Sequence, residues 1–105
     1  MINITFFTKG DSITGFEIKG HTMFREHGSD ILCASISSAS YMTVNTITDV
    51  LHIKCGIEVD DGYMYVTLES EDVLEAQTIL KGFKLHILEL EKDYGDYILV
   101  KNSEV

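Results

Sequence analysis

The chain has 105 residues, of which 45% are apolar, so we expect one domain, residues 1–105, with a modest hydrophobic core. Its formal charge of −9, from 17 acidic and 8 basic residues, argues against a nucleic-acid-binding surface. The acidic excess favours a basic partner, or it only keeps the domain soluble. No segment approaches the roughly 18 apolar residues of a membrane span, and the first residues lack the pattern of a secretory signal, so we expect a cytoplasmic protein with no membrane partner.

The first part of the chain predicts a β-hairpin followed by a long helix. Alternating apolar residues indicate strands over 2–8 and 15–19, and the glycine-containing segment between them is typical of a turn. A turn-forming segment precedes Asp30, a residue type that caps helix N-termini well, and an apolar helical pattern begins at Ile31. We therefore expect Asp30 to cap a helix that runs from Ile31 to about Leu51.

The second part of the chain predicts another hairpin and another helix. Strands are expected over 57–59 and 63–68, because the Asp-Gly turn between them is a strong hairpin signal. Ser70 is the expected cap of the second helix, with Glu71 and Asp72 in its first turn. Apolar residues at helical spacing mark the face that this helix buries. They are Val73, Ala76, Ile79, Leu80, Phe83, Ile87 and Leu90.

The order of these elements predicts the fold class. The tail, residues 96–101, alternates enough to form a further edge strand or an ordered arm. The preceding order, β-β-α-β-β-α, indicates an α+β protein, a two-layer sandwich of an antiparallel sheet and two helices.

Two residues with catalytic chemistry flank the expected start of the first helix. With Asp30 as the cap, Cys33 is the third helical residue, where unpaired backbone N–H groups and the helix dipole favour a thiolate and an oxyanion. His21 precedes the intervening loop, and Gly20 and Gly28 allow that loop to bend sharply. If the fold brings His21 and Cys33 together, they suffice for thiol nucleophilic catalysis. The alternative is a core cysteine without a chemical role.

The other histidines and the second cysteine are weaker candidates. They are His27, His52, His86 and Cys55. Their spacing is not that of a zinc site, so we expect no metal and no cofactor. His27 remains a rival to His21 as the base, and Cys55 is expected in the core. Reduced thiols are expected rather than a structural disulfide, and a redox role that joins Cys33 to Cys55 is a further alternative.

The order Gly-His, a loop, Gly-x-Asp-Ile-x-Cys-Ala and then Ser resembles the ribosomal-processing cysteine protease family called Prp. Eight residues carry the resemblance, and they are Gly20, His21, Gly28, Asp30, Ile31, Cys33, Ala34 and Ser37. The length and the order of elements are similar over nearly the whole chain. The resemblance implies His21 as general base and Cys33 as nucleophile.

The same resemblance implies supporting or substrate-binding positions at five residues. They are Gly20, Gly28, Asp30, Ala34 and Ser37. The chain departs from the family at Thr22, where an alanine is more familiar, and residues 23–27 follow no family pattern. These departures concern the substrate contacts of the loop more than the chemistry.

The resemblance also implies a function. The implied enzyme is a cysteine endopeptidase that removes the N-terminal extension of the large-subunit ribosomal protein L twenty-seven. Cleavage would follow a short apolar segment that contains an aromatic residue. This processing would support ribosome assembly or function. The partner would be this basic ribosomal protein, and the enzyme a homodimer joined through an edge strand or the second helix. The alternative is a non-catalytic, ribosome-associated module that binds a basic peptide. The loop 22–29 is expected to be a mobile gate over the substrate.

Overall fold

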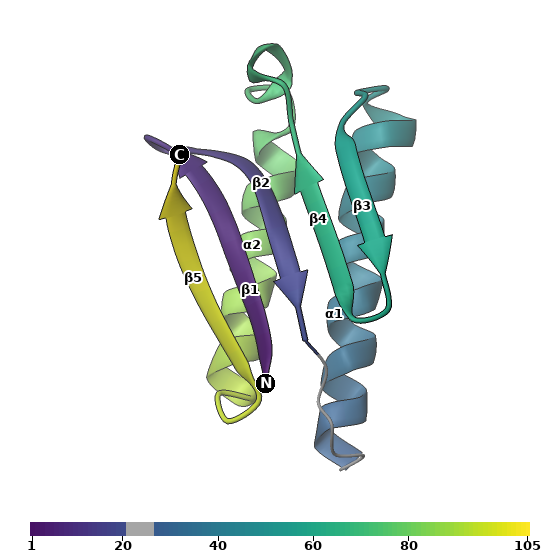
Figure 1. Ribbon diagram of the computed structural model, residues 1–105, viewed down its shortest axis with the longest axis vertical. Coiled ribbons are helices and arrows are strands. Elements are labelled where there is room, and N and C mark those ends of the chain that lie inside the picture. The colour runs from purple at the N-terminus through teal and green to yellow at the C-terminus, as the bar shows by residue number, and fades with distance from the viewer. Residues whose placement is uncertain (21–26) are drawn as a thin grey trace.

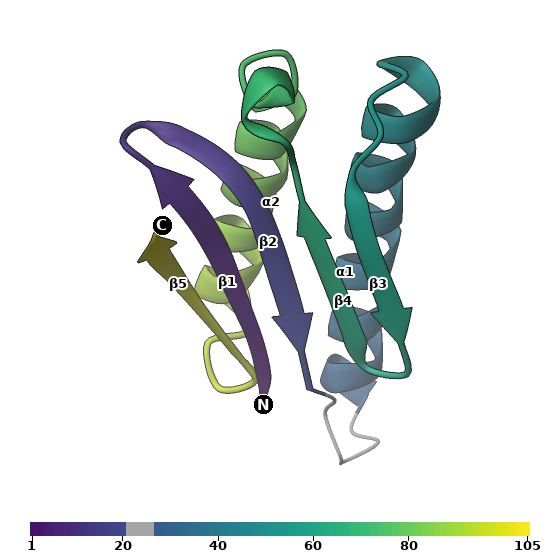
Figure 2. The same ribbon diagram turned by 45° about the horizontal axis from the view of Figure 1, so that its top comes forward.

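Five strands form one sheet, and two helices cover one of its faces (Figure 1). The computed structural model describes the backbone of residues 1–20 and 27–105, and the side chains of residues 1–20 and 31–105. The strands are β1 (Ile2–Lys9), β2 (Ser12–Lys19), β3 (Gly56–Asp60), β4 (Tyr63–Thr67) and β5 (Ile98–Glu104). The main helices are α1 (His27–Asn45) and α2 (Gln77–Asp93). In both views α1 lies behind β3 and β4, and α2 behind β1 and β2 (Figure 1 and Figure 2), which confirms the two-layer α+β sandwich.

The first hairpin is confirmed, and its second strand is longer than predicted. β2 begins at Ser12 rather than Gly15, and its pairing with β1 shifts at a bulge between Phe7 and Thr8. Alternate residues of β1 are buried, as the two-residue period of a strand requires, whereas the alternation in β2 is interrupted at Gly15 and Phe16, next to the bulge. These inner residues are Ile2, Ile4, Phe6, Ile13, Phe16 and Ile18.

The second hairpin is confirmed as well, and the tail is a strand. β5 pairs with β1 in parallel, from Ile2 opposite Ile98 to Thr8 opposite Glu104. The sheet, in the order β3-β4-β2-β1-β5, is therefore mixed, and the predicted antiparallel pairing holds only for the other four strands. The direction of β5 follows from α2, which connects β4 to β5. A helix between two strands returns the chain to the end of the sheet where the earlier strand began, so β5 runs parallel to β4 and to β1.

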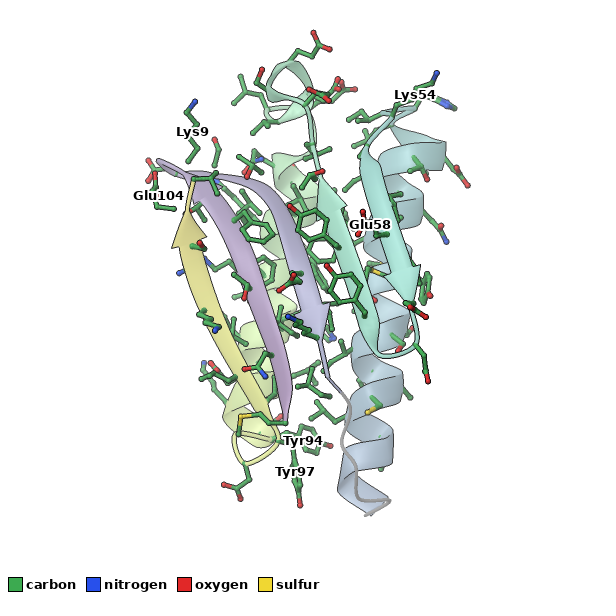
Figure 3. All side chains as sticks on the ribbon, in the orientation of Figure 1. Lys9, Lys54, Glu58, Tyr94, Tyr97 and Glu104 are labelled. Atoms are coloured by element: carbon green, nitrogen blue, oxygen red, sulfur yellow. The ribbon has the colours of Figure 1, made fainter. Side chains whose placement is uncertain are left out.

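Polar contacts hold β5 in place at both ends. The Ile2 N–H donates to the carbonyl of Tyr97 at 2.8 Å, just before β5 begins. At the other end, Figure 3 shows Glu104 beside the β1–β2 turn, where its carboxylate accepts the Gly10 N–H and the Thr8 hydroxyl, each at 3.1 Å. These contacts join the C-terminal strand to the first hairpin.

The first helix starts earlier than predicted and ends where expected. α1 begins at His27, so Asp30 lies inside its first turn and the predicted cap at Asp30 is wrong. An acidic residue is favoured both as a cap and within the first turn, because both positions lie at the positive end of the helix dipole. A π-helical turn, Thr46–Val50, continues α1, and His52, with a φ of 57°, follows its end.

The second helix starts later than predicted. Ser70 opens a short 3-10 turn, Ser70–Asp72, and α2 itself begins at Gln77 after Ala76, so the predicted cap at Ser70 is wrong. The Gln77 side chain bonds to both backbone groups of Ile13, accepting its N–H at 2.8 Å and donating to its carbonyl at 2.7 Å. The start of α2 is thereby held against β2, a contact between distant segments that local sequence preference does not contain.

The predicted buried face of α2 is confirmed, and it completes an aromatic core. Phe83 lies 5.7 Å from Phe6 and 4.8 Å from Phe16 between ring centroids, so the three rings join α2 to β1 and β2. Leu80 and Ile87 are fully buried on the same face. Within the described parts of the chain, neither α1 nor α2 is long and apolar enough to cross a membrane.

We expect Gln77→Ala to lower the free energy of unfolding by about 1–3 kcal/mol, because it leaves both backbone groups of Ile13 without their partner. Thr78→Ala, at the next and exposed position, is the matched control. Urea unfolding at equilibrium measures both variants. Equal stability of the two would contradict a role for Gln77 in holding α2 against β2.

Candidate active site

A cavity of about 330 Å³ lies between α1 and one end of the sheet. One wall comes from α1, through Cys33, Ile36, Ser37, Ser40 and Tyr41. The other comes from the sheet, through Ile2, Ile18, Gly20 and residues 59–64 of the β3–β4 hairpin. The N-terminal part of α1 extends past the end of this hairpin (Figure 1). The cavity therefore joins three segments that are distant in sequence.

Cys33 lies on the side of α1 that faces the cavity. Cys33, Ser37 and Tyr41 are spaced by four residues, so they follow one another along a single side of the helix. Cys33 is partly buried and packs against the core, whereas Ser37 and Tyr41 are exposed. Ser40 is buried, and its hydroxyl donates to the Ser37 carbonyl at 3.0 Å. Small hydroxyl residues thus line α1 where it packs on the sheet.

Gly20 brings the end of β2 to the same cavity. Its φ is +104°, a conformation that side chains rarely adopt, and a Cβ there would lie 2.5 Å from the Met1 carbonyl oxygen. The Gly20 N–H donates to the Gly62 carbonyl at 3.0 Å, which joins β2 to the β3–β4 turn. The sharp bend predicted at Gly20 is therefore present. The residue that follows it, His21, lies outside the described residues.

The structure brings some of the predicted site residues together. Gly20, Cys33 and Ser37 line one cavity, whereas Ala34 is exposed and is not part of its lining. Gly28 and Asp30 belong to the first turn of α1, where only the backbone is described. Of the predicted gate, residues 22–29, the part 22–26 lies outside the described residues. Residues 27–29 belong to α1 and not to a loop, so that end of the predicted gate is wrong. His27, the rival base, is described only by its backbone.

The position of Cys33 in the helix differs from the prediction. Because α1 begins at His27, Cys33 is its seventh residue and not its third. The unpaired N–H groups of a helix belong to its first turn, so those of α1 are not at Cys33. The predicted third helical position of Cys33 is therefore wrong, and stabilisation of a thiolate or an oxyanion there by these amides has lost its basis. Asp30 instead precedes Cys33 by one turn within α1.

Several cavity residues had no predicted site role. Asp60, Asp61 and Gly62 were identified from the sequence only as a turn, and their place in the same cavity as Cys33 depends on the pairing of β4 with β2. Tyr63 lines the same wall, and its hydroxyl donates to Glu17 at 3.3 Å. Partial burial and the Glu17 carboxylate raise the pKa of Tyr63 above its ordinary value. No local signal in the sequence distinguished these residues from an ordinary hairpin.

The second cysteine lies elsewhere. Cys55 lies in a shallow hollow with Thr48, His52 and Lys54, and it forms no disulfide with Cys33. Burial raises the pKa of the Cys55 thiol, which makes it a weaker nucleophile at neutral pH. Over the residues that the structure describes, no three His, Cys, Asp or Glu side chains are grouped to hold a metal ion.

Comparison with known proteins identifies first the class of enzyme. The chain is 30% identical over 110 residues to the ribosomal processing cysteine protease Prp of Bacillus subtilis, with 98% of each chain covered. It is 28% identical over 99 residues to the protein of that name from Staphylococcus aureus, with 92% of each covered. The chain is thus a cysteine protease. The family model for the cysteine protease Prp matches residues 1–99, and the chain belongs to that family.

Solved structures have the same fold. SMU.848 from Streptococcus mutans superposes with a TM-score of 0.88 at 24% identity, covering 100% of this chain and 99% of the other. The ribosomal processing protease Prp from Staphylococcus aureus, in complex with a covalently linked product peptide, gives 0.86 at 25% identity, covering 98% and 100%. A covalently linked product peptide on that protein is what a protease with a nucleophilic side chain forms.

We expect Gly20→Ala to lower the free energy of unfolding by about 1–3 kcal/mol, because a Cβ is strained at this φ and meets the Met1 carbonyl. Gly82→Ala is the matched control, since a Cβ at Gly82 in α2 has no atom within 4 Å. That control should gain about 0.5–1 kcal/mol from helix propensity. Thermal and urea unfolding test the pair, and two changes of the same sign would contradict the assignment.

We expect iodoacetamide to modify Cys55 near neutral pH more slowly than it modifies cysteine in a short unstructured peptide. The reason is the raised pKa, which lowers the thiolate fraction of Cys55 until the pH passes beyond the ordinary value of 9.0. The measurement uses the Cys33→Ser variant and intact mass over a pH series. A Cys55 that reacts as fast as the peptide near neutral pH would contradict the effect of burial.

Proposed function

We propose that this protein removes the N-terminal extension of the large-subunit ribosomal protein L twenty-seven, with Cys33 as nucleophile and His21 as general base. The observation that carries the proposal is the cavity that Cys33 shares with Gly20, because Gly20 directly precedes His21. The membership of the chain in the Prp family supports it, and so does the family resemblance of the Gly-His and Cys-Ala segments.

In the proposed reaction, the His21 imidazole accepts the proton of the Cys33 thiol. The sulfur then forms a bond to the scissile carbonyl carbon, and the carbonyl oxygen becomes an oxyanion. The imidazolium protonates the leaving amine as the C–N bond breaks, which leaves a thioester on Cys33. Water attacks this thioester, His21 accepts its proton, and the released sulfur is protonated again. No redox partner or cofactor takes part.

The supporting residues take positions around this pair in the proposal. Asp30 and Ser37 precede and follow Cys33 by about one turn of α1, close enough along the helix to orient the catalytic groups. Gly20 serves the bend that precedes His21. Gly28 lies in the first turn of α1 and not at a bend, so its place in the proposal is at the start of that helix. Ala34 lies outside the cavity lining, which limits it to an indirect role.

The composition of the cavity supports a peptide with apolar and basic residues. Ile18, Ile36 and Met64 provide an apolar wall that suits the apolar, aromatic-containing segment before the scissile bond. Asp60 and Asp61 are part of the lining and suit a basic segment. The relatives are named ribosomal processing proteases, and one was solved with a substrate peptide, so a ribosomal protein is the substrate class that we assign.

Further features belong to the same proposal. The enzyme acts as one protease domain over residues 1–105, in the cytoplasm, as a homodimer and without a nucleic-acid or membrane partner. The formal charge of −9 supports the choice of a basic protein over a nucleic acid, because phosphate backbones repel an acidic surface. The exposed Leu85 on α2 and Leu99 on β5 are apolar residues that a second copy would cover.

The test is incubation of the purified protein with unprocessed L twenty-seven from the same organism, followed by intact mass. We expect the loss of one defined N-terminal fragment, and a fall in kcat/KM of about a thousandfold or more in Cys33→Ala and in His21→Ala. Cys55→Ser is the matched control and keeps the activity, because Cys55 lies in a different hollow.

Circular dichroism of each variant separates lost chemistry from lost folding. Full activity of folded Cys33→Ala would contradict the assignment of the nucleophile. Binding of the substrate by every variant with cleavage by none, including the wild type, would instead indicate a binding module.

A further inference from the structure

The β3 edge of the sheet is open and lies beside the cavity. β3 is the terminal strand on this side, and all five of its residues are exposed (Figure 1). Val59 and Asp60, at the end of β3, line the cavity that contains Cys33. An extended chain laid along this edge would therefore pass directly to the thiol.

The pairing pattern shows which backbone groups of β3 point outward. The Leu68 N–H donates to the Thr14 carbonyl, and the Gly62 carbonyl accepts the Gly20 N–H. The backbone groups of the even-numbered residues in and next to β4 therefore point toward β2. Odd-numbered residues of β4 then bond toward β3, and their partners are Gly56, Glu58 and Asp60. The N–H and C=O groups of Ile57 and Val59 consequently point away from the sheet.

The side chains of the same two residues are also incompletely covered. Ile57 and Val59 are paired with the buried Val66 and Met64, which places them on the helix side of the sheet. They are nevertheless 38% and 50% exposed, and Tyr41 on the neighbouring side of α1 is 48% exposed. An added strand would pair with the outward backbone groups and cover this apolar surface at once.

We propose that the peptide substrate binds as an added strand along β3, pairing with the backbone of Ile57 and Val59, and that this pairing aligns its scissile bond with Cys33. The inference rests on the proposed protease function. Main-chain pairing provides affinity for any extended segment, and alternate side chains face α1 and the cavity.

Charge favours a basic peptide as the occupant of this edge. Glu58 lies on β3, where Figure 3 labels it, and Asp60 and Asp61 follow at the cavity. Lys54 is the basic residue that precedes the strand, at its far end from the cavity. β5, the other edge of the sheet, contributes no residue to the cavity lining, so it offers a peptide no route to Cys33.

Val59→Pro tests the proposal, because proline removes the outward N–H of Val59 without removing a bond to β4. We expect kcat/KM for a peptide spanning the cleavage site of L twenty-seven to fall by about tenfold or more, since one pairing bond is lost and the carbonyl of the peptide is left unpaired. Val59→Thr, which keeps the N–H, should lose less than about threefold.

Two controls separate binding from folding. Asn102→Pro places a proline on the exposed β5 edge and should leave cleavage at the wild-type rate. Alkylation of Cys33 by iodoacetamide should proceed equally in the wild type and Val59→Pro, because a small reagent needs no strand pairing. If Val59→Pro does not fold, N-methylation of the peptide at successive backbone positions gives the answer with the wild-type enzyme, as a loss of cleavage at alternate positions.

Several results would overturn the proposal. Equal cleavage by folded Val59→Pro and the wild type, or uniform tolerance of N-methylation, would exclude strand addition and leave the protease function intact. A change from dimer to monomer in Val59→Pro, seen by sedimentation, with unchanged kcat/KM would assign the edge to a second copy of this chain. Absence of cleavage by the wild type would contradict the proposed function itself, and this inference with it.

Discussion

The burial of one face of the sheet is the constraint on which the rest of the structure depends. The inner residues of β1 and β2 must leave water, and α2 covers them through Phe83 while α1 covers the half of the sheet formed by β3 and β4. This arrangement decides where α1 lies. The position of Cys33 beside the ends of β1, β2 and the second hairpin follows from that packing rather than from the sequence near Cys33.

The cavity lies between α1 and the sheet, and Gly20 at the end of β2 is part of its lining. Gly20 is held by its bond to Gly62 and by the closeness of Met1, so the chain leaves β2 at a defined point beside Cys33. The wall on the other side is a regular helix that packs through small hydroxyl residues such as Ser40. A catalytic pair needs its groups held in a fixed geometry. In our proposal, β2 up to Gly20 and α1 at Cys33 are the two elements that provide it.

The two cysteines lie in different parts of the structure. Cys33 lines the cavity between α1 and the hairpin, whereas Cys55 lies in a shallow hollow where burial raises its pKa. The same cavity continues to the exposed β3 edge through Val59. Cys33, the apolar residues of the cavity and the outer edge of β3 are thus connected, which is the arrangement that our proposal needs for an extended peptide.

Alternation and turn chemistry by themselves determined both hairpins and the buried face of α2, because strand and helix periods are local properties of the chain. The family resemblance rested on the residues around Cys33, and comparison over residues 1–99 confirmed it. The predicted starts of both helices, capped by Asp30 and Ser70, were wrong, because acidic and hydroxyl residues are favoured both as a cap and within the first turn. Only the tertiary structure decided the parallel direction of β5, the place of Asp60 in the same cavity as Cys33, and the open β3 edge. Each of these depends on pairing between segments far apart in the chain, which no local preference encodes.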